Sequence, residues 1–486
     1  MNWKLLIALF VTHLSFSQVE VGLLYEEMPN DSIEKASITN HSSIRPFIRT
    51  TNIAASAYSS SIRGFKDTVP KLLITPIFDA GIKIDNELSS RTGLGVSLSS
   101  IKYSKWYYKI SVIEGFGEAK NDRFQPKAFI FQPKTGDQFI YTDIRGRASY
   151  TPNKVFNFQA GIDHNFIGEG NRSLLLSDYG KPYPFAKIRA AFWKVEYMML
   201  YQFFLEETPK KEWKSKYAAT HLISYNPTKW LNLGIFESVV FAPKDTNLNR
   251  GFDAEYLNPI VFFRPQEYSL GSSDNVLLGV LTSIKIKQHT IYSQVVIDDF
   301  DLYQIKKRTQ WWANKYGAQL GVKGRFKYTN KNFFYRCEFN FTRPYTYSHK
   351  TSSQNYGNQG YSLAHPYGGN FYEILGELKW QNKKWIVKVF ANYFMHGADK
   401  KDGLSYGGDI YASYDIRPYE FGNTIGQGIK NNGVRLMFTT SYLLDQGSNL
   451  QVFMEHQLRG NTAYSQPVYQ IVVGLRSCLW NDYRNY

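Results

Sequence analysis

The sequence predicts an all-β fold, a transmembrane antiparallel β-barrel of about 18 strands with a small N-terminal periplasmic segment. Three observations predict this fold. The chain begins with a secretory signal, alternating apolar and polar residues recur over most of its length, and short polar turns alternate with long loops. After the signal, no stretch reaches the roughly 18 uninterrupted apolar residues that a membrane-spanning helix needs.

The N-terminus has the layout of a secretory signal. A lysine precedes the mostly apolar residues 5–14, and Ser15 and Ser17 are small residues at the positions that signal peptidase reads. We therefore expect a signal peptide over residues 1–17, cleaved before Gln18. The apolar run is too short to anchor the chain in a bilayer, and no cysteine lies near the cleavage site to carry a lipid. The alternative is a buried first strand or helix.

The composition fits a membrane barrel better than a soluble globule. Aromatic residues make up 16% of the chain, with Tyr 36, Phe 34 and Trp 10, whereas the mean hydropathy is −0.38. Barrels combine these properties because lipid-facing and lumen-facing residues alternate and because Tyr and Trp favour the membrane interface. The two cysteines, Cys337 and Cys478, are too few for a disulfide framework and lie in no CxxC or Cys/His cluster. We therefore expect no metal site.

The net charge of +16 raises the question of an anionic partner. Nucleic acid is a poor candidate, because the Lys and Arg residues are scattered through alternating segments and form no basic run. In an exported chain, the surplus fits anionic membrane lipid and lipopolysaccharide head groups, or an acidic surface polysaccharide. The alternative is a solvated basic surface with no partner.

A hairpin at residues 318–342 shows the two-residue period most clearly. Its arms flank a polar turn at residues 329–332, and each has about ten residues, the length that a tilted strand needs to cross a bilayer. One face of the arms is apolar and consists of Ala318, Leu320, Val322, Phe326, Tyr328, Phe333, Tyr335, Cys337, Phe339 and Phe341. The opposite face is polar and consists of Gln319, Lys323, Arg325, Lys327, Arg336, Glu338, Asn340 and Thr342.

The same alternation recurs at residues 191–201, 231–235, 372–380, 385–395, 434–444, 450–458 and 469–479. These strands are generally longer than the five or six residues typical of a soluble sandwich. Long polar loops alternate with short turns, the arrangement of outer-membrane barrels, and they lie at residues 243–273, 345–369 and 397–430. At about 22–25 residues per strand and connection, the chain accommodates about 16–18 strands, and we expect about 18.

The mature chain divides into two parts. We expect residues 18–90 to form an N-terminal periplasmic segment and residues 91–486 to form the barrel, because residues 26–62 are polar and lack alternation. Short helices or irregular structure are expected in the segment, with a disordered leader as the alternative. Within the barrel, Cys337 falls on the lipid-facing set and Cys478 on the opposite set of its strand, so the two thiols are not expected to pair.

Known catalytic motifs are missing from the sequence. There is no GxSxG elbow, HExxH pair or P-loop, and the Gly-x-Gly at residues 168–170 lacks the third glycine of a dinucleotide-binding turn. The acidic run at residues 298–301 lacks the glycine and terminal Glu of a calcium loop, so a solvated turn is the better interpretation. His164, His365 and His396 each stand alone. We therefore expect no enzyme activity and no cofactor.

Three short motifs of the sequence lie between the expected strands. Residues 166–184 read FIGEGNRSLLLSDYGKPYP, a strand end followed by Gly-x-Gly, Ser-Leu-x-Leu-Ser and Pro-x-Pro. Residues 255–259 read EYLNP, and residues 361–366 read YSLAHP, followed by Gly-Asn-Phe at 369–371. Together the motifs resemble the capsule assembly Wzi family of outer-membrane barrels. The third motif resembles the Bacteroidetes branch of that family, which includes the gliding-motility protein RemB.

This resemblance implies a barrel of about 18 strands with a small periplasmic helical part, acting at the cell surface in capsular or exopolysaccharide attachment or in gliding motility. The implied partners are surface polysaccharide and gliding or secretion machinery proteins, beside membrane lipid, and no nucleic acid. The ligand-binding or motif positions that it marks are Gly168, Gly170, Arg172, Ser173, Asp178, Asn258, Pro259, His365 and Asn370. Alternatively, the two glycines and Pro259 only shape loops that fold into the lumen.

Three functions are compatible with such a barrel, since a fold alone does not define a function. The first is a non-enzymatic surface protein, whose loop Tyr and Trp residues stack on sugar rings while Arg and Lys residues pair with acidic sugars. The second is a diffusion porin for anionic solutes or oligosaccharides. The third, a barrel enzyme, needs a nucleophile beside a base, and no Ser/His/Asp spacing indicates one.

Overall fold

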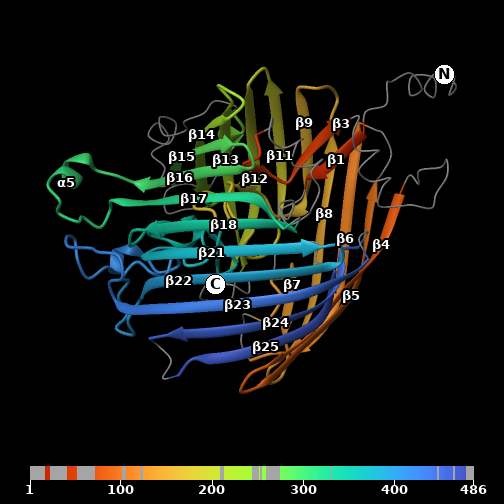
Figure 1. Ribbon diagram of the computed structural model, residues 1–486. Helices are drawn as coiled ribbons and strands as arrows, with labels where there is room; N and C mark the ends of the chain where they lie inside the picture. Colours follow the sequence, from red (N-terminus) through yellow and green to blue (C-terminus); the bar gives the residue numbers. More distant parts are fainter. Residues whose placement is uncertain are drawn as a thin grey trace.

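Figure 1 shows the computed structural model of the chain. It describes residues 17–21, 41–51, 72–100, 105–120, 124–207, 213–243, 251, 254–258, 274–329, 331–445, 448–462 and 466–477. The expected signal peptide lies outside this described part except for Ser17, and so do Pro259 and Cys478. No helix among the described residues is long and apolar enough to cross a membrane.

The described residues form a closed barrel of 18 antiparallel strands, which confirms the predicted fold class (Figure 1). Each strand pairs with the next along the chain, and the last pairs with the first, so that Arg476 lies beside Asp79. Closure leaves no unpaired sheet edge inside the bilayer. The strands are β4 (Leu72–Ile84), β5 (Leu88–Ser100), β6 (Trp106–Glu118), β8 (Gln138–Tyr150), β9 (Phe156–Asp163), β11 (Tyr183–Phe192), β12 (Val195–Glu207), β13 (Trp213–Tyr225), β14 (Leu231–Phe241), β15 (Asn275–Ile286), β16 (His289–Asp299), β17 (Lys315–Tyr328), β18 (Lys331–Thr342), β21 (Phe371–Asn382), β22 (Trp385–Ala398), β23 (Ile429–Asp445), β24 (Leu450–Asn461) and β25 (Val468–Ser477).

The remaining elements are short. β1 (Ser17–Val21) pairs with β3 (Phe47–Thr51), and β2 (Ile44–Arg45) pairs with β10 (Phe166–Ile167). Three more strands belong to the loops, where β7 (Ile130–Pro133) pairs with β8 and β19 (Gly357–Asn358) pairs with β20 (Tyr361–Ser362). The helical turns are α5 (Leu302–Lys306), η2 (Ala254–Leu257), η3 (Ser352–Gln354) and η4 (Tyr414–Ile416).

The barrel begins earlier than the sequence predicts. β4 and β5 cover residues 72–100 and pair along their whole length, so residues 72–90 belong to the barrel and not to the N-terminal segment. The alternation in β4 is hard to recognise, because Leu72, Leu73 and Ile74 are consecutive apolar residues and Pro76 follows them. The described residues of the N-terminal segment form strands and turns, and no helix occurs among them.

Side chains alternate between the two faces of the barrel wall in the predicted register. On β17 and β18, Leu320 and Phe339 are exposed on the outer face, whereas Lys323 and Glu338 are buried on the lumenal face. Met395 departs from this register, because it is buried where the loop between β22 and β23 packs against it. A closed barrel with an apolar outer face is the architecture of outer-membrane proteins, and this chain is an outer-membrane barrel.

The position of Cys337 on the outer face predicts which reagents label its thiol. Cys337 is exposed on β18, at the middle of that strand. In a Cys478→Ser background reconstituted in lipid vesicles, we expect a lipid-soluble maleimide to label Cys337 and a charged, membrane-impermeant maleimide to leave it unlabelled. A Lys120→Cys/Cys337→Ser/Cys478→Ser variant is the control, since the Lys120 side chain is exposed beyond the end of β6. Labelling of Cys337 by the charged reagent would contradict the register.

The two ends of the barrel differ in the length of their connections. At one end, which we call the turn end, strands join through two residues at 193–194, 287–288 and 383–384. At the other, the loop end, the connections include residues 242–274, 343–370 and 399–428, as the sequence predicts. α5 projects from the loop end, beyond the strands that carry it (Figure 1). Outer-membrane barrels place short turns in the periplasm and long loops outside the cell.

Candidate functional site

Residues 164–182, which connect β9 to β11, fold into the lumen, and we call them the plug segment. Its three consecutive leucines, Leu174 to Leu176, are completely buried and belong to an apolar cluster with Leu200, Phe236 and Leu277 of the barrel wall. The N–H of Leu174 donates to the side chain of Gln294 on β16 at 2.8 Å. The lumen therefore has a packed apolar core on the side of β12 to β16, instead of a continuous aqueous space.

The loop between β18 and β21 holds the plug segment from the loop end. Tyr347 donates its hydroxyl proton to the Leu174 carbonyl at 2.7 Å, and Tyr356 donates to the Leu175 carbonyl at 2.7 Å. The N–H of Ser177 in turn donates to the carbonyl of Leu363 at 2.7 Å. These bonds satisfy backbone groups that would otherwise be buried without partners, which is what makes a leucine-rich loop stable inside a barrel.

Residues 41–46 of the N-terminal segment enter the lumen from the turn end. Ile44 joins the apolar cluster of the plug segment, and Arg45 donates to the Gly168 carbonyl at 2.8 Å. Near the turn end, His41 lies 2.7 Å from the hydroxyl of Ser224. The N-terminal segment is therefore partly a component of the plug, and not only a periplasmic appendage as the sequence suggests.

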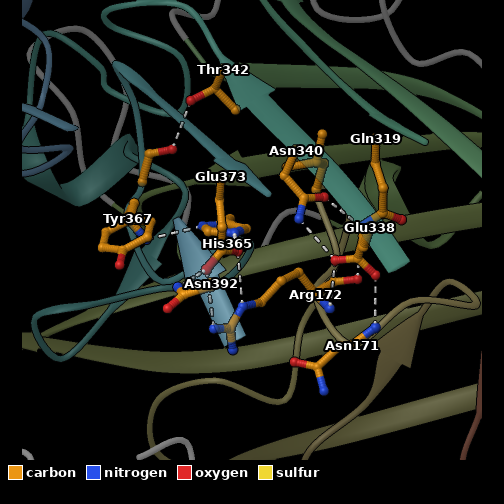
Figure 2. A network of polar contacts seen from close by, with 12 residues as sticks. Asn171, Arg172, Gln319, Glu338, Asn340, Thr342, His365, Tyr367, Glu373 and Asn392 are labelled. Carbon is orange, nitrogen blue, oxygen red and sulfur yellow. Dashed lines mark hydrogen bonds and ion pairs between the residues drawn. The ribbon is translucent and has the colours of Figure 1, made fainter. Parts of the chain in front are cut away.

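Arg172 and His365 meet at one carboxylate, that of Glu373 on β21 (Figure 2). Arg172 Nε lies 3.3 Å from Glu373 Oε2, and His365 Nε2 lies 2.9 Å from the same oxygen. Asn392 adds a hydrogen bond to Glu373 Oε1 at 2.7 Å. All three charged or titratable side chains are fully buried, and a buried ion pair is retained only where such partners satisfy both charges.

Burial lowers the pKa of His365 to about 4, although the Glu373 carboxylate acts in the opposite direction. The ring is therefore neutral at physiological pH. Its Nε2–H donates to Glu373, and its Nδ1 accepts the N–H of Tyr367 at 3.2 Å. Because both ring nitrogens have partners, His365 acts in this arrangement as an orienting group for Glu373.

The pKa of His365 predicts how stability depends on pH. An unfolded histidine takes up a proton near pH 6.5, whereas the folded one stays neutral down to about pH 4. Above pH 6.5 the neutral ring therefore contributes roughly 3 kcal/mol to the free energy of unfolding. This contribution is lost as the pH falls toward 4. We expect the free energy of unfolding in detergent micelles to fall over this range, and to fall less in His365→Gln, which keeps a donor to Glu373. Equal slopes in the two proteins would contradict the assignment.

Glu338 on β18 fixes the backbone of the plug segment to the wall (Figure 2). Its carboxylate accepts the N–H groups of Asn171 at 2.9 Å and Arg172 at 3.2 Å. It also accepts from the Tyr292 hydroxyl and the Asn340 amide, each at 2.8 Å. A carboxylate with four donors is a strong anchor, because hydrogen bonds to ionised acceptors are about twice as strong as neutral ones.

The two glycines of the Gly-x-Gly motif lie where the plug segment touches the wall most closely. Gly168 has φ +145°, and a Cβ there would lie 2.3 Å from the amide nitrogen of Gln294. A Cβ on Gly170 would lie 2.3 Å from Glu338 Oε2. Any side chain at either glycine would collide with the wall, so both glycines allow the plug segment to approach it closely.

Ser173 and Asn370 organise backbone. The Ser173 hydroxyl donates to the Ile167 carbonyl at 2.6 Å and accepts from the N–H of Leu175 at 3.1 Å, which bends the plug segment around its leucines. Asn370, with φ +60°, donates to the Gly397 and Gln427 carbonyls at 2.9 and 3.0 Å and so ties the end of β22 and the loop that follows it to the start of β21. Asp178 lies at a polar pocket on the other side of the lumen.

The second motif lies outside the barrel, away from the plug. Tyr256 of η2 stacks on Phe241 with ring centroids 4.7 Å apart and donates to Asp274 at 2.6 Å. The hydroxyl of Tyr201, on the outer face of β12, donates to the Leu257 carbonyl at 3.2 Å. The structure thus places Asn258 beside an aromatic cluster that covers part of the outer wall, and does not bring it together with Arg172 or His365.

The sequence identified Arg172 and His365 but not the groups that unite them. Glu338 and Glu373 appear in the sequence only as polar members of alternating strands, and Gln294 lies outside the segments predicted as strands. A carboxylate that faces the lumen of a barrel needs a partner. The lumenal position of Glu338 and Glu373 could therefore have predicted that each binds a partner inside the barrel. In the acidic run at 298–301, Asp298 pairs with Lys315 at 2.9 Å. The described residues contain no group of three or more His, Cys, Asp or Glu side chains placed to hold a metal ion.

Fold and site together define a class of protein, an 18-stranded outer-membrane β-barrel whose lumen contains a folded plug. No protein-family model and no curated protein matches the sequence. The fold is similar to that of Wzi from Escherichia coli, described as an outer-membrane protein involved in group 1 capsule assembly and a carbohydrate-binding β-barrel. The two chains are 11% identical over 92% of this chain and 98% of Wzi, with a TM-score of 0.56.

Two further solved structures match with lower TM-scores. OprD from Pseudomonas aeruginosa matches 83% of this chain at 6% identity with a TM-score of 0.44, over 94% of its own length. OccAB2 from Acinetobacter baumannii matches 84% at 10% identity with a TM-score of 0.46, over 97% of its own length. At such identities a likeness concerns the fold, so function has to be argued from the lumen and loops of this chain.

Proposed function

We propose that this protein is a non-enzymatic outer-membrane barrel that holds capsular or exopolysaccharide at the cell surface. The observation that carries this proposal is the filled lumen. Three buried leucines, the Arg172–Glu373 pair and the Glu338 anchor fix the plug segment in place. A diffusion channel needs a continuous aqueous path, and a packed apolar core interrupts it on this side of the barrel.

The loop end provides the kind of surface that binds sugars. The Trp312 ring packs on Tyr414 with centroids 4.8 Å apart, and the Arg417 guanidinium lies over Trp312 at 4.1 Å. Tyr419 and Phe421 are exposed on the same loop. Aromatic faces stack on sugar rings, and guanidinium groups pair with acidic substituents. The carbohydrate-binding description of Wzi supports the same assignment.

Within this proposal, the protein serves either to retain polysaccharide on the cell surface or in gliding motility. The resemblance of residues 361–366 to the RemB branch supports gliding, with gliding or secretion machinery proteins as further partners. We also propose that the protein has no catalytic activity. Its support is that His365, the buried histidine of the plug, uses both ring nitrogens in structural hydrogen bonds.

Deletion of the coding region tests the proposal. We expect the deleted strain to lose capsule retention or colony spreading, while uptake of small solutes is unchanged. The purified full-length protein should also bind the strain's own surface polysaccharide in a pull-down assay. If retention and spreading are normal while solute uptake falls, the proposal is wrong and a transport function replaces it.

A diffusion porin for anionic solutes is the second candidate. The observation that favours it is the polar side of the lumen, where Arg91, Arg145 and Arg476 line a pocket that the leucines do not reach. Liposome swelling distinguishes the candidates: a porin admits small anionic sugars at a rate that rises with protein content, whereas a plugged barrel leaves the rate at the level of empty liposomes.

A further inference from the structure

The turn end of the barrel carries lysines on nearly every connection. Eight connections join the strands there, at residues 101–105, 151–155, 193–194, 226–230, 287–288, 329–330, 383–384 and 446–449. Six of them contain a lysine, and Lys327 and Lys331 flank a seventh. None of the eight contains Asp or Glu, whereas residues 399–428 at the loop end contain five. The connections of the turn end therefore carry positive charge alone.

The side chains of these lysines are exposed, and we call them the lysine ring. Its described members are Lys105, Lys154, Lys194, Lys229, Lys287, Lys327, Lys331, Lys383 and Lys384. Within the described part of the chain, ion pairs with carboxylates are formed by other lysines, such as Lys83, Lys120 and Lys388. Like charges gathered on one surface repel each other, and an anionic partner removes that repulsion.

Aromatic rings accompany the lysine ring. Exposed tryptophans stand next to one of its members in the sequence at four positions, Trp106, Trp193, Trp230 and Trp385. The Lys194 ammonium lies 5.4 Å from the ring centre of Trp193, and the Lys331 ammonium lies 5.4 Å from that of Trp380. Tryptophan prefers the boundary between hydrocarbon and water. The tryptophans therefore place the lysine ring at the surface of the bilayer.

The outer wall next to the turns favours lipid as the partner. Phe192 and Ile286, the last residues of β11 and β15, are exposed on the outer face directly before two of the turns. A lysine beside such a wall can lay its methylene chain along apolar surface and place its ammonium among the head groups. Anionic head groups attract these ammonium groups, and each lysine adds to the attraction.

We propose that the lysine ring binds anionic phospholipid in the periplasmic leaflet of the outer membrane. The head-group phosphates contact the ammonium groups, and the acyl chains lie along the tryptophans and the apolar wall. The leaflet follows from the turn end, because outer-membrane barrels place their short turns in the periplasm. This interaction fixes the depth of the barrel in the bilayer, and it does not depend on the proposed role in holding polysaccharide.

Tryptophan fluorescence in lipid vesicles tests the preference for anionic lipid. The full-length protein is reconstituted in phosphatidylcholine vesicles that contain brominated phosphatidylglycerol or, in parallel, brominated phosphatidylcholine. Bromine quenches the tryptophans that it contacts, and four exposed tryptophans lie at the lysine ring. We expect the anionic lipid to bind there about fivefold more strongly than the neutral one, and less so at high salt. Equal quenching by the two lipids overturns the proposal.

Two variants show whether the lysine ring causes the preference. The ring variant carries four substitutions in three turns, Lys229→Gln, Lys287→Gln, Lys383→Gln and Lys384→Gln. Lys194 is kept because its ammonium donates to the Pro227 carbonyl at 2.7 Å. The control variant replaces four exposed lysines of the loop end by Gln, namely Lys120, Lys350, Lys400 and Lys401. We expect the ring variant to lose most of the preference and the control to keep it. An equal loss in both, or none in the ring variant, contradicts the assignment.

Peptidoglycan is an anionic polymer on the same side of the membrane, so it is the competing partner. Sedimentation of the full-length protein in neutral detergent with purified peptidoglycan distinguishes the two. We expect wild type and the ring variant to sediment to the same small extent. If wild type sediments, the ring variant does not, and the lipid preference is missing, the lysine ring binds the cell wall and the lipid proposal is wrong.

Discussion

Arg172→Met should lower the free energy of unfolding by about 3 kcal/mol or more, the usual result of removing one partner of a buried ion pair. The Arg172 and Glu373 side chains are fully buried, and the guanidinium reaches both carboxylate oxygens. Without Arg172, Glu373 keeps only neutral donors, from His365 and Asn392. Removing the guanidinium also raises the pKa of His365, because its charge disfavours the protonated ring.

A second substitution separates the ion pair from the packing of the side chain. Arg172→Met/Glu373→Gln removes both charges, so we expect it to recover much of the lost free energy in urea unfolding of the barrel in micelles. The control is Lys120→Met, which breaks an exposed ion pair with Glu87 and should leave stability unchanged. If the double variant is as unstable as Arg172→Met, the ion pair with Glu373 is not the source of the stability that Arg172 provides.

Leu175→Asp should release the plug segment from the lumen. Leu175 is completely buried in the apolar cluster, and a Cβ on Gly279 would lie 2.5 Å from its Cδ2, so the site has no spare room. A carboxylate there has no cationic partner among the cluster residues, and burying one unpaired is far costlier than losing the leucine contacts, about 2–5 kcal/mol. The barrel wall has its own hydrogen bonds, so we expect the plug to give way and the wall to remain closed.

Planar-bilayer recording measures this release. The Leu175→Asp protein should show conductance steps that the wild type lacks, while its mobility on unheated gels remains that of a folded barrel. Leu175→Met is the matched control, because it conserves volume and should cost less than about 1.5 kcal/mol. If Leu175→Asp is folded and as silent as Leu175→Met, the leucines do not close the lumen.

The barrel itself was largely predictable from the sequence. Alternation with a period of two is a local property, and the outer positions Leu320, Phe339 and Val389 are exposed as expected. The long loops were predictable for the same reason, since they interrupt the alternation. The start of the barrel was not, because Pro76 and consecutive apolar residues hide the pattern in β4.

The plug was predictable only in its parts. The motif residues Gly168, Arg172 and His365 could be marked, but Arg172 and His365 lie far apart in the sequence and meet only through Glu373. Such contacts depend on which way a loop folds relative to the wall, which no local pattern encodes. The entry of residues 41–46 into the lumen was missed for the same reason, since this polar segment has no alternation to indicate a buried position.

The plug segment closes the folded barrel. Single-channel recording on the full-length wild-type protein in planar bilayers tests this claim most directly. The filled lumen, with Leu174 to Leu176 packed against the wall and Glu338 anchoring the plug backbone, predicts a silent membrane or at most brief small events. A large, steady conductance from the wild-type protein would contradict it.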